Sequence, residues 1–395
     1  MRPLAALAVA LATALPAVAG PLTAGAAAVD ITPPKGCPMA GYYHIRGAEG
    51  THDPLLAKAL VFETDGTKVA LVSLDLLYTT APIVADARKL VEKGTGIPGG
   101  HVMISATHAH TGPVLWDGGA RGALFGAEHK LAREYTAALP AKIAEAVQKA
   151  DAARKPAKVS FGTGKEDGLA FNRRFHMLDG SVGWNPGKKN PNIVRPAGPT
   201  DPAVPVVLVE TDDKQPKPIA VYVNFAMHLD TVGGLLYSAD YPGTLAKGVA
   251  AALGDDVVTV FATGCCGDIN HINVNSARRQ HGHGEAARIG TRLAAETLRT
   301  IDRGLTPAEG GLRVSAETVE LALPATTAED AVKAKAVIAE LEKGAKPVPK
   351  FLDQVKAFQT LDVAERLGKP LPVEVQVISL GQDLAWVSLP GEVFV

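Results

Sequence analysis

The chain has 395 residues, 47% hydrophobic and 21% charged, and its 40 basic and 41 acidic side chains give a formal net charge of −1. This balance is typical of a globular protein with a large core, and it excludes a general electrostatic attraction to nucleic acid. Three cysteines are too few for a disulfide framework. Cys37 could pair with Cys265 or Cys266, or all three could be buried thiols.

The first twenty residues differ in character from the rest of the chain. One arginine precedes an apolar run over residues 4–15, and small residues follow before Gly20. This order is typical of a secretory signal peptide, and Pro16 ends an apolar run that is too short to span a bilayer. We therefore expect residues 1–19 to be a signal peptide and residues 20–395 to be the exported domain, secreted or periplasmic.

Five short apolar runs, rich in β-branched residues, predict buried strands. Their hydrophobicity is nearly continuous, as in strands that are covered on both faces. They cover residues 68–77, 101–107, 205–210, 219–226 and 257–264. Between the second and third runs, residues 180–205 are rich in Pro, Gly and Asn and predict a long surface loop.

Apolar residues at helical spacing separate these runs. One stripe consists of Tyr135, Leu139, Ile143 and Val147, with Pro140 as an expected kink, and the other of Ile289, Leu293, Leu298 and Ile301. Residues 312–323 alternate like a half-exposed strand, and two further strands are predicted at 373–380 and 383–389. We expect an α/β fold with a single large mixed-sheet domain and flanking helices.

A pair of helices is predicted between the last strands, over about residues 326–368. Thr327 and Asp330 have the spacing of an N-terminal cap, and Gly344 is placed to stop the first helix. A second helix follows Pro349. We interpret this pair as an insertion into the α/β domain or as a lid.

Polar side chains gather where the predicted strands end, which is where α/β proteins place their sites. His108 and His110 follow the strand at 101–107, and side chains two residues apart on extended backbone point the same way. The other candidates are His228, the Gly-Asp turn with Asp268, Asn270 and His271, the pair Arg173 and Arg174, and Glu392 after the last strand. We expect a zinc site at these strand ends, because zinc in hydrolases takes three ligands from His and Glu and leaves a position for water.

Each candidate residue could also have a purely structural role. A lone histidine at a strand end, such as His228, is more often a hydrogen-bonded structural residue. The spacing of His108 and His110 alone is not specific for zinc. Arg173 could be an ordinary surface cation, and Glu392 could cap a turn.

Several segments resemble, in the same order, the neutral ceramidase family, the neutral/alkaline non-lysosomal ceramidases. They are HDPLLAKALVF, SLDLL, ISATHAHTGP, FNRR, NFAMHLDTVGG, SADYPG, TGCCGDINHINV and LPGE. The resemblance is to the N-terminal catalytic domain of that family and covers nearly all of the chain after the leader. Family members are zinc amidases that cleave the N-acyl bond of ceramide to a fatty acid and sphingosine.

The resemblance implies a Zn²⁺ cofactor and a set of site residues. Carried over by motif, His108, His228 and Glu392 would be metal ligands, and Arg173 matches an arginine of the family. We assign catalytic roles to His110, as the proton shuttle or an oxyanion donor, to Arg173, as the other oxyanion donor, and to Asp268. Asp268 would orient a histidine or the polar head of the substrate, or it would pin its turn.

The chain departs from the family in two places. The family motif GDVSPN reads GDINHI here, so Asn270 stands where serine is expected and His271 where proline is; we assign both to substrate binding. The chain also ends at Val395, before the tyrosine that completes the family's metal shell and before its immunoglobulin-like domain. We interpret this as truncation, with the fourth ligand being solvent or another residue.

Three functions remain open from the sequence. They are a zinc amidase acting on ceramide or a similar N-acyl lipid, a zinc hydrolase of the same fold acting on another amide or ester, and an exported binding protein without catalysis. The expected partner is a small-molecule or lipid amide, with peripheral membrane contact and without nucleic acid. Leu235, Leu236 and Tyr237 could form an apolar rim for a lipid or belong to the core.

Overall fold

The computed structural model describes residues 20–117, 122, 124–343, 349–366 and 368–395. The signal peptide predicted at residues 1–19 and the helix stop predicted at Gly344 lie outside the described residues. Among the helices of the described part, none combines the length and the apolar character that crossing a membrane requires.

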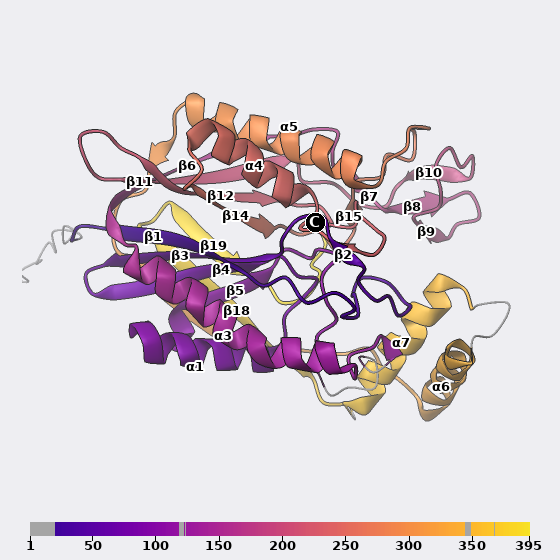
Figure 1. The fold of residues 1–395 in the computed structure, drawn as a ribbon. Coiled ribbons are helices and arrows are strands. Elements are labelled where there is room, and N and C mark those ends of the chain that lie inside the picture. Colours follow the sequence, from indigo (N-terminus) through magenta and orange to yellow (C-terminus); the bar gives the residue numbers. More distant parts are fainter. Residues whose placement is uncertain (1–19, 118–121, 123, 344–348, 367) are drawn as a thin grey trace, which may run out of the picture.

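Two halves of one sheet pack face to face between two layers of helices (Figure 1). The first half consists of β14 (Val258–Thr263), β12 (Pro218–Phe225), β11 (Ala203–Thr211) and β6 (Lys155–Lys165), with β16 (Thr306–Pro307) beside β6. The second half consists of β1 (Thr23–Asp30), β3 (Leu56–Thr64), β4 (Thr67–Leu74) and β5 (Val102–Ala106). The halves join where the first residues of β1 pair with β6, Thr23 opposite Pro156 and Ala24 opposite Lys155.

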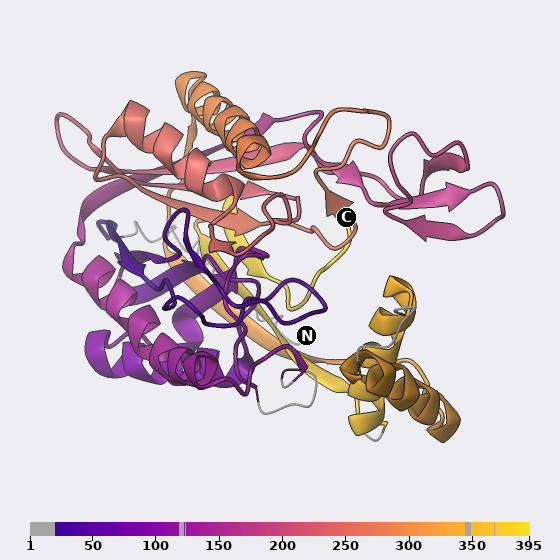
Figure 2. The same cartoon turned by 45° about the vertical axis from the view of Figure 1, so that its right-hand side comes forward.

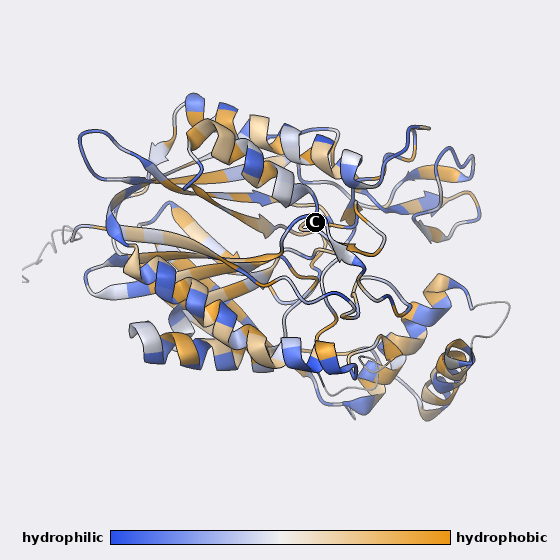
Figure 3. Cartoon of the chain, viewed as in Figure 1, coloured by the Kyte–Doolittle hydropathy of each residue, from blue (hydrophilic) through white to orange (hydrophobic). Residues whose placement is uncertain are grey.

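Two helices cover the outer face of each half. The half that contains β11 and β12 is covered by α4 (Tyr241–Leu253) and α5 (His283–Asp302). The half that contains β1 and β3 is covered by α1 (Ala81–Thr95) and α3 (Lys130–Ala152), which continues through Pro140. The strands are mostly hydrophobic in both halves (Figure 3) because helices cover one face and the other half of the sheet covers the other. This arrangement confirms the predicted mixed α/β fold.

The core between the two halves contains large side chains from both, such as Leu60, Phe62, Val207 and Val260. A small antiparallel sheet of β17 (Leu312–Leu321), β18 (Leu371–Leu380) and β19 (Leu384–Ser388) adds Trp386 to this core. Both halves have a parallel pair at one edge, β12 with β14 and β4 with β5. The loops that follow these parallel strands form the site described below.

The structure differs from the sequence predictions in two respects. The five predicted buried strands are present, but β1, β3 and β6 were not among them. The predicted loop at 180–205 is wrong in part, because β9 (Val182–Trp184) and β10 (Ile193–Pro196) flank β8 (Arg174–Met177) in a three-stranded sheet. The β-branched and aromatic residues of these short strands outweigh the surrounding Pro and Gly.

The predicted helical pair consists of α6 (Ala328–Glu342) and α7 (Phe351–Glu365), and it stands apart from the four layers (Figure 2). Thr327 and Asp330 form the predicted capping box. The pair lies in the chain between β17 and β18, which are antiparallel neighbours. Phe358 of α7 contacts Tyr43 and Phe125, with ring centroids 5.6 and 5.3 Å away. The helical pair therefore packs against Tyr43, which belongs to the segment 42–47 beside the pocket discussed below.

Candidate metal centre

The loop after β5 carries His108 and His110. The backbone N–H of His108 donates to Leu76 O at 2.9 Å. His108 itself has a φ of 72°, in the left-handed region that is costly for a residue other than glycine. The strand ends at Ala106, so extended backbone does not align the two histidines as the sequence suggested. A strained turn brings them to the same place, and strain of this kind is concentrated at functional sites.

The loop after β12 carries His228 and lies beside the first loop. His228 N–H donates to Ile269 O at 3.1 Å, and Ala109 forms an isolated parallel bridge with Leu229. His110 N–H donates to Leu229 O at 3.0 Å. These backbone contacts join the strand ends of the two halves of the sheet, so the three imidazoles sit where the halves meet.

Each imidazole is oriented by a backbone carbonyl on its Nδ1. The Nδ1 atom of His108 lies 2.9 Å from Leu77 O, that of His110 lies 2.9 Å from Gly41 O, and that of His228 lies 3.0 Å from Cys266 O. A carbonyl oxygen only accepts, so each Nδ1 carries the proton. In the neutral ring, Nε2 then bears a lone pair.

The three Nε2 atoms face one another. That of His108 lies 2.9 Å from the Nε2 of His228 and 3.3 Å from the Nε2 of His110. Burial and the neighbouring His108 lower the pKa of His110 to about 4, and burial, His108 and Arg173 place the pKa of His228 well below its usual value. These two rings are therefore neutral at pH 7. Lone pairs at this separation repel each other unless a proton or a cation lies among them.

Glu392 and Arg173 complete the cluster. The carboxylate of Glu392 lies 3.6 Å from His108 Nε2 and 3.4 Å from His228 Nε2. Arg173 Nη2 lies 3.4 Å from the same carboxylate and donates to Gly267 O at 2.7 Å, and the guanidinium stacks over Trp184 at 4.1 Å. The three residues implied as ligands, together with His110 and Arg173, therefore meet at one site.

The C-terminal segment reaches this site by lying against the turn after β14 (Figure 1). Gly267 N–H donates to Val393 O at 2.9 Å, and a Cβ atom on Gly267 would lie only 2.2 Å from Glu392 O. The guanidinium of Arg174 lies 5.1 Å from the ring centroid of Phe394. The approach of Glu392 therefore requires a glycine in the turn.

Asp268 and Asn270 lie beside the cluster. The Asp268 carboxylate accepts from Asn172 Nδ2 at 2.8 Å and from Val395 N at 3.2 Å, and among the described residues it bonds no histidine. These contacts fit the role of pinning the turn rather than that of orienting a ligand. Asn270 donates to Asn185 at 3.0 Å and lines a pocket of about 230 Å³.

His271 forms a buried pair with Asp230, a residue that the sequence analysis did not select. Its Nδ1 lies 3.1 Å from Asp230 Oδ1. Burial acts to lower the pKa of His271, but the bond and the charge of Asp230 outweigh it and the pKa is raised. Burial likewise acts to raise the pKa of Asp230, and His271 reverses this effect. Asp230 follows His228 by two residues, and that spacing was the available signal.

The remaining sequence alternatives are also resolved. Cys37, Cys265 and Cys266 are free thiols, and burial raises the pKa of Cys266 to about 12 and that of Cys37 to about 11. Tyr237 is fully buried and belongs to the core, whereas Leu236 is 37% exposed. Leu235 lines a second pocket near the cluster. The apolar rim expected from these three residues is therefore limited to the two leucines.

Comparison with solved structures finds the same fold in two ceramidases. The neutral ceramidase from Pseudomonas aeruginosa matches with a TM-score of 0.67 and 18% identity, over 91% of this chain and 61% of that chain. A ceramidase complexed with C2 matches with a TM-score of 0.68 and 17% identity, over 94% of this chain and 64% of that one.

This chain thus spans less than two thirds of the length of either ceramidase. No model of a known protein family matches the sequence, and no curated protein matches it either. At this level of identity the likeness establishes the fold, which this chain shares with the two ceramidases.

Proposed function

We propose that the protein is a zinc-dependent hydrolase that cleaves an N-acyl amide bond, in the manner of a ceramidase. The observation that carries the proposal is the convergence of three imidazoles, whose possible ligand atoms all lie within 4.8 Å of one another. The fold and the resemblance in sequence motifs support the reaction class.

The donor set fits zinc. His108, His110 and His228 offer nitrogen donors, and Glu392 offers a carboxylate within 3.4–3.6 Å of two of them. Imidazoles with one carboxylate are a ligand set typical of catalytic zinc, and each ring is fixed by a hydrogen bond on its other nitrogen. When bound, zinc would supply a Lewis acid and lower the pKa of water toward about 7.

We assign His110 to the metal together with His108, His228 and Glu392. Its Nδ1 is committed to Gly41 O and its Nε2 faces the other two rings, so neither nitrogen is directed outward as a proton shuttle would be. The sequence assigned proton transfer to His110. A His110→Gln variant separates the roles, because loss of a ligand lowers zinc affinity and loss of a shuttle leaves it unchanged.

Arg173 is the proposed oxyanion donor and holds Glu392 in place. Arg173 is 7% exposed, and its guanidinium is fixed by Gly267 O, Glu392 and the ring of Trp184. A donor that is fixed in advance stabilises developing negative charge without reorganising during the reaction. A buried arginine cannot act as a general acid at neutral pH, so the proton for the leaving amine would come from solvent.

Metal content and hydrolysis, measured on the same samples, test this proposal. We expect about one zinc per chain, hydrolysis of N-dodecanoylsphingosine or of a smaller N-dodecanoyl amide, loss of hydrolysis with a chelator, and recovery with zinc. The exposed His281 is a matched control, so His281→Ala should keep both zinc and activity. Chelator-resistant hydrolysis, or zinc binding without hydrolysis of any N-acyl amide or ester, would contradict the proposal.

A further inference from the structure

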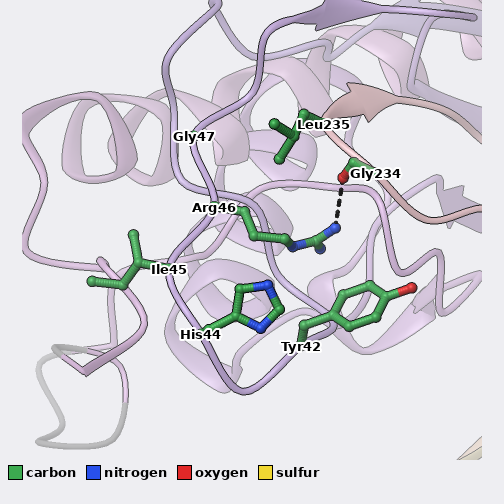
Figure 4. Close-up of a pocket in the computed structure, with 7 residues that line it drawn as sticks. All are labelled: Tyr42, His44, Ile45, Arg46, Gly47, Gly234 and Leu235. Carbon is green, nitrogen blue, oxygen red and sulfur yellow. Dashed lines mark hydrogen bonds between the residues drawn. The ribbon is translucent and has the colours of Figure 1, made fainter. Parts of the chain in front are cut away.

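A second pocket, of about 480 Å³, lies next to the imidazole cluster. It is lined by residues of the segment 42–47 on one side and by Gly234 and Leu235 on the other (Figure 4). The ring of Tyr42 in this pocket lies 6.2 Å from that of His110, centroid to centroid. The pocket is therefore close enough to the cluster to take part of a molecule whose reacting bond lies there.

Arg46 lines the pocket and is 7% exposed. Its guanidinium donates to three backbone carbonyls, those of Gly234 at 2.8 Å, His110 at 3.0 Å and Ala40, and it lies 4.1 Å from the centroid of the Tyr42 ring. Figure 4 shows the side chain extending across the pocket to Gly234. Within the described part of the chain, Nε has no partner and no carboxylate lies within 4 Å of the guanidinium.

The other buried cations of the described residues are paired with an acid. Lys58 lies 2.8 Å from Asp75, and Arg173 lies 3.4 Å from Glu392. Carbonyl groups supply partial charges only, so Arg46 keeps its full positive charge without a counter-ion. Burial of an unpaired charge is costly, and an anion in the adjoining pocket would remove the imbalance.

The rest of the lining fits an anionic group attached to an aliphatic one. Tyr42 and His44 add hydrogen-bonding side chains, and no acidic residue lines the pocket. Ile45 and Leu235 supply apolar surface, and Ile45 is 62% exposed. Arginine is well suited to carboxylate and phosphate because its planar N–H groups match their oxygens.

We infer that Arg46 binds an anionic oxygen group of the substrate, a carboxylate or a phosphate, so that the preferred substrate is an N-acyl amide whose amine part carries that group. This inference rests on the proposed hydrolysis and deepens it. It predicts a substrate preference different from that of an enzyme that is selective for a neutral amine part such as sphingosine.

Three substrates that share one acyl chain test the inference: N-dodecanoylglycine, N-dodecanoylphosphoethanolamine and the neutral N-dodecanoylethanolamine. We expect the wild-type kcat/KM to be higher for one of the anionic substrates, and the better of the two identifies the anion. In Arg46→Met we expect this preference to fall by about 10- to 100-fold, the typical value of a hydrogen bond to a charged group. Arg46→Lys should retain part of it, and the exposed Arg313→Met on β17 should retain all.

Arg46 also bonds the backbone of His110 and Ala40, so its loss could disturb the site as a whole. The decisive quantity is therefore the ratio of kcat/KM for the anionic substrate to kcat/KM for the neutral one. A purely structural role would lower hydrolysis of all three substrates equally and leave the ratio unchanged, which would overturn the inference. So would a wild-type protein without preference for either anion. Calorimetric binding of N-dodecanoylglycine and of N-dodecanoylphosphoethanolamine to wild type and Arg46→Met decides the question even without turnover, since equal affinities of the two proteins for both ligands would also overturn it.

Discussion

Two buried histidine environments lie side by side in this molecule and differ in what holds them. His228 is 2% exposed, and its Nδ1 bonds a carbonyl while its Nε2 faces two other imidazoles. His271 is 4% exposed, and its Nδ1 bonds the carboxylate of Asp230. The pKa of the first is lowered and that of the second is raised.

The difference shows what distinguishes a metal centre from an ion pair. In the pair of His271 and Asp230 each charge has its partner, although His271 Nε2 is buried without a hydrogen-bond partner among the described residues. The cluster of His108, His110 and His228 gathers three nitrogen donors and no acid among them, and such a set can hold a cation. Variants at the two sites test this distinction.

The largest effect is expected from removal of a ring in the cluster. His108→Ala or His228→Ala should abolish zinc binding and lower hydrolysis by at least about 1,000-fold, because the ligand set is broken. Zinc content by mass spectrometry and initial rates on the same preparation measure both quantities. Full zinc occupancy in both variants would remove these residues from the metal shell.

A smaller loss is expected from Arg173, which contacts the cluster but offers no lone pair. Arg173→Ala should keep its zinc and lose about 100-fold in kcat, the usual effect of removing one oxyanion donor. Steady-state kinetics at saturating zinc give the measurement. A normal kcat would eliminate the catalytic role, and lost zinc would indicate that the arginine serves Glu392 alone.

For the ion pair of His271 and Asp230 we expect an effect on stability rather than on zinc binding. His271→Asn leaves Asp230 buried without its partner, which should lower the free energy of unfolding by about 3 kcal/mol. Urea denaturation measures this loss, and zinc content should stay at the wild-type level. If the variant had normal stability but no longer bound zinc, the pair of His271 and Asp230 would have to be part of the metal centre.

The pH dependence of stability should have opposite signs at the two sites in the metal-free protein. The folded-state pKa of His110, about 4, lies below its unfolded value of about 6.5, so the unfolded chain binds the extra proton and stability falls as pH drops from 6.5 to 4. We expect a loss on the order of 2 kcal/mol after allowance for partial exposure of the ring. His110→Gln should reduce this loss.

The raised pKa of His271 gives stability that is present below about pH 6.5 and is lost as pH rises through the folded-state value. Thermal unfolding from pH 4 to 8, compared among wild type, His110→Gln and His271→Asn, separates the two contributions. Identical pH profiles for all three proteins would contradict the comparison.

Much of the architecture could be predicted because it depends on local patterns. Continuous β-branched runs revealed the strands that are covered on both faces, and the spacing of Thr327 and Asp330 revealed a capping box. The stacking of the two half-sheets was not predictable in this way, because it depends on which faces meet. The small sheet around β8 was missed because Pro and Gly dominate the composition of residues 180–205.

The candidate site could be predicted as a set of residues but not as a geometry. The motifs led to His108, His228 and Glu392, whereas the strained turn at His108 and the orientation of each Nδ1 required coordinates. Asp230 and Arg46 were missed for the same reason. Whether a charged residue is buried, and whether it has a partner, depends on segments that are distant in the sequence.

Zinc K-edge X-ray absorption of the zinc-loaded protein reports the ligands of the metal themselves and so decides whether the imidazole cluster is the metal centre. A centre built from His108, His110, His228 and Glu392 predicts a shell of nitrogen and oxygen at about 2.0–2.1 Å, with multiple scattering from three imidazoles and without sulfur. A sulfur shell at about 2.3 Å, which would place the ion on Cys265 and Cys266, or a protein that binds no zinc, would contradict it.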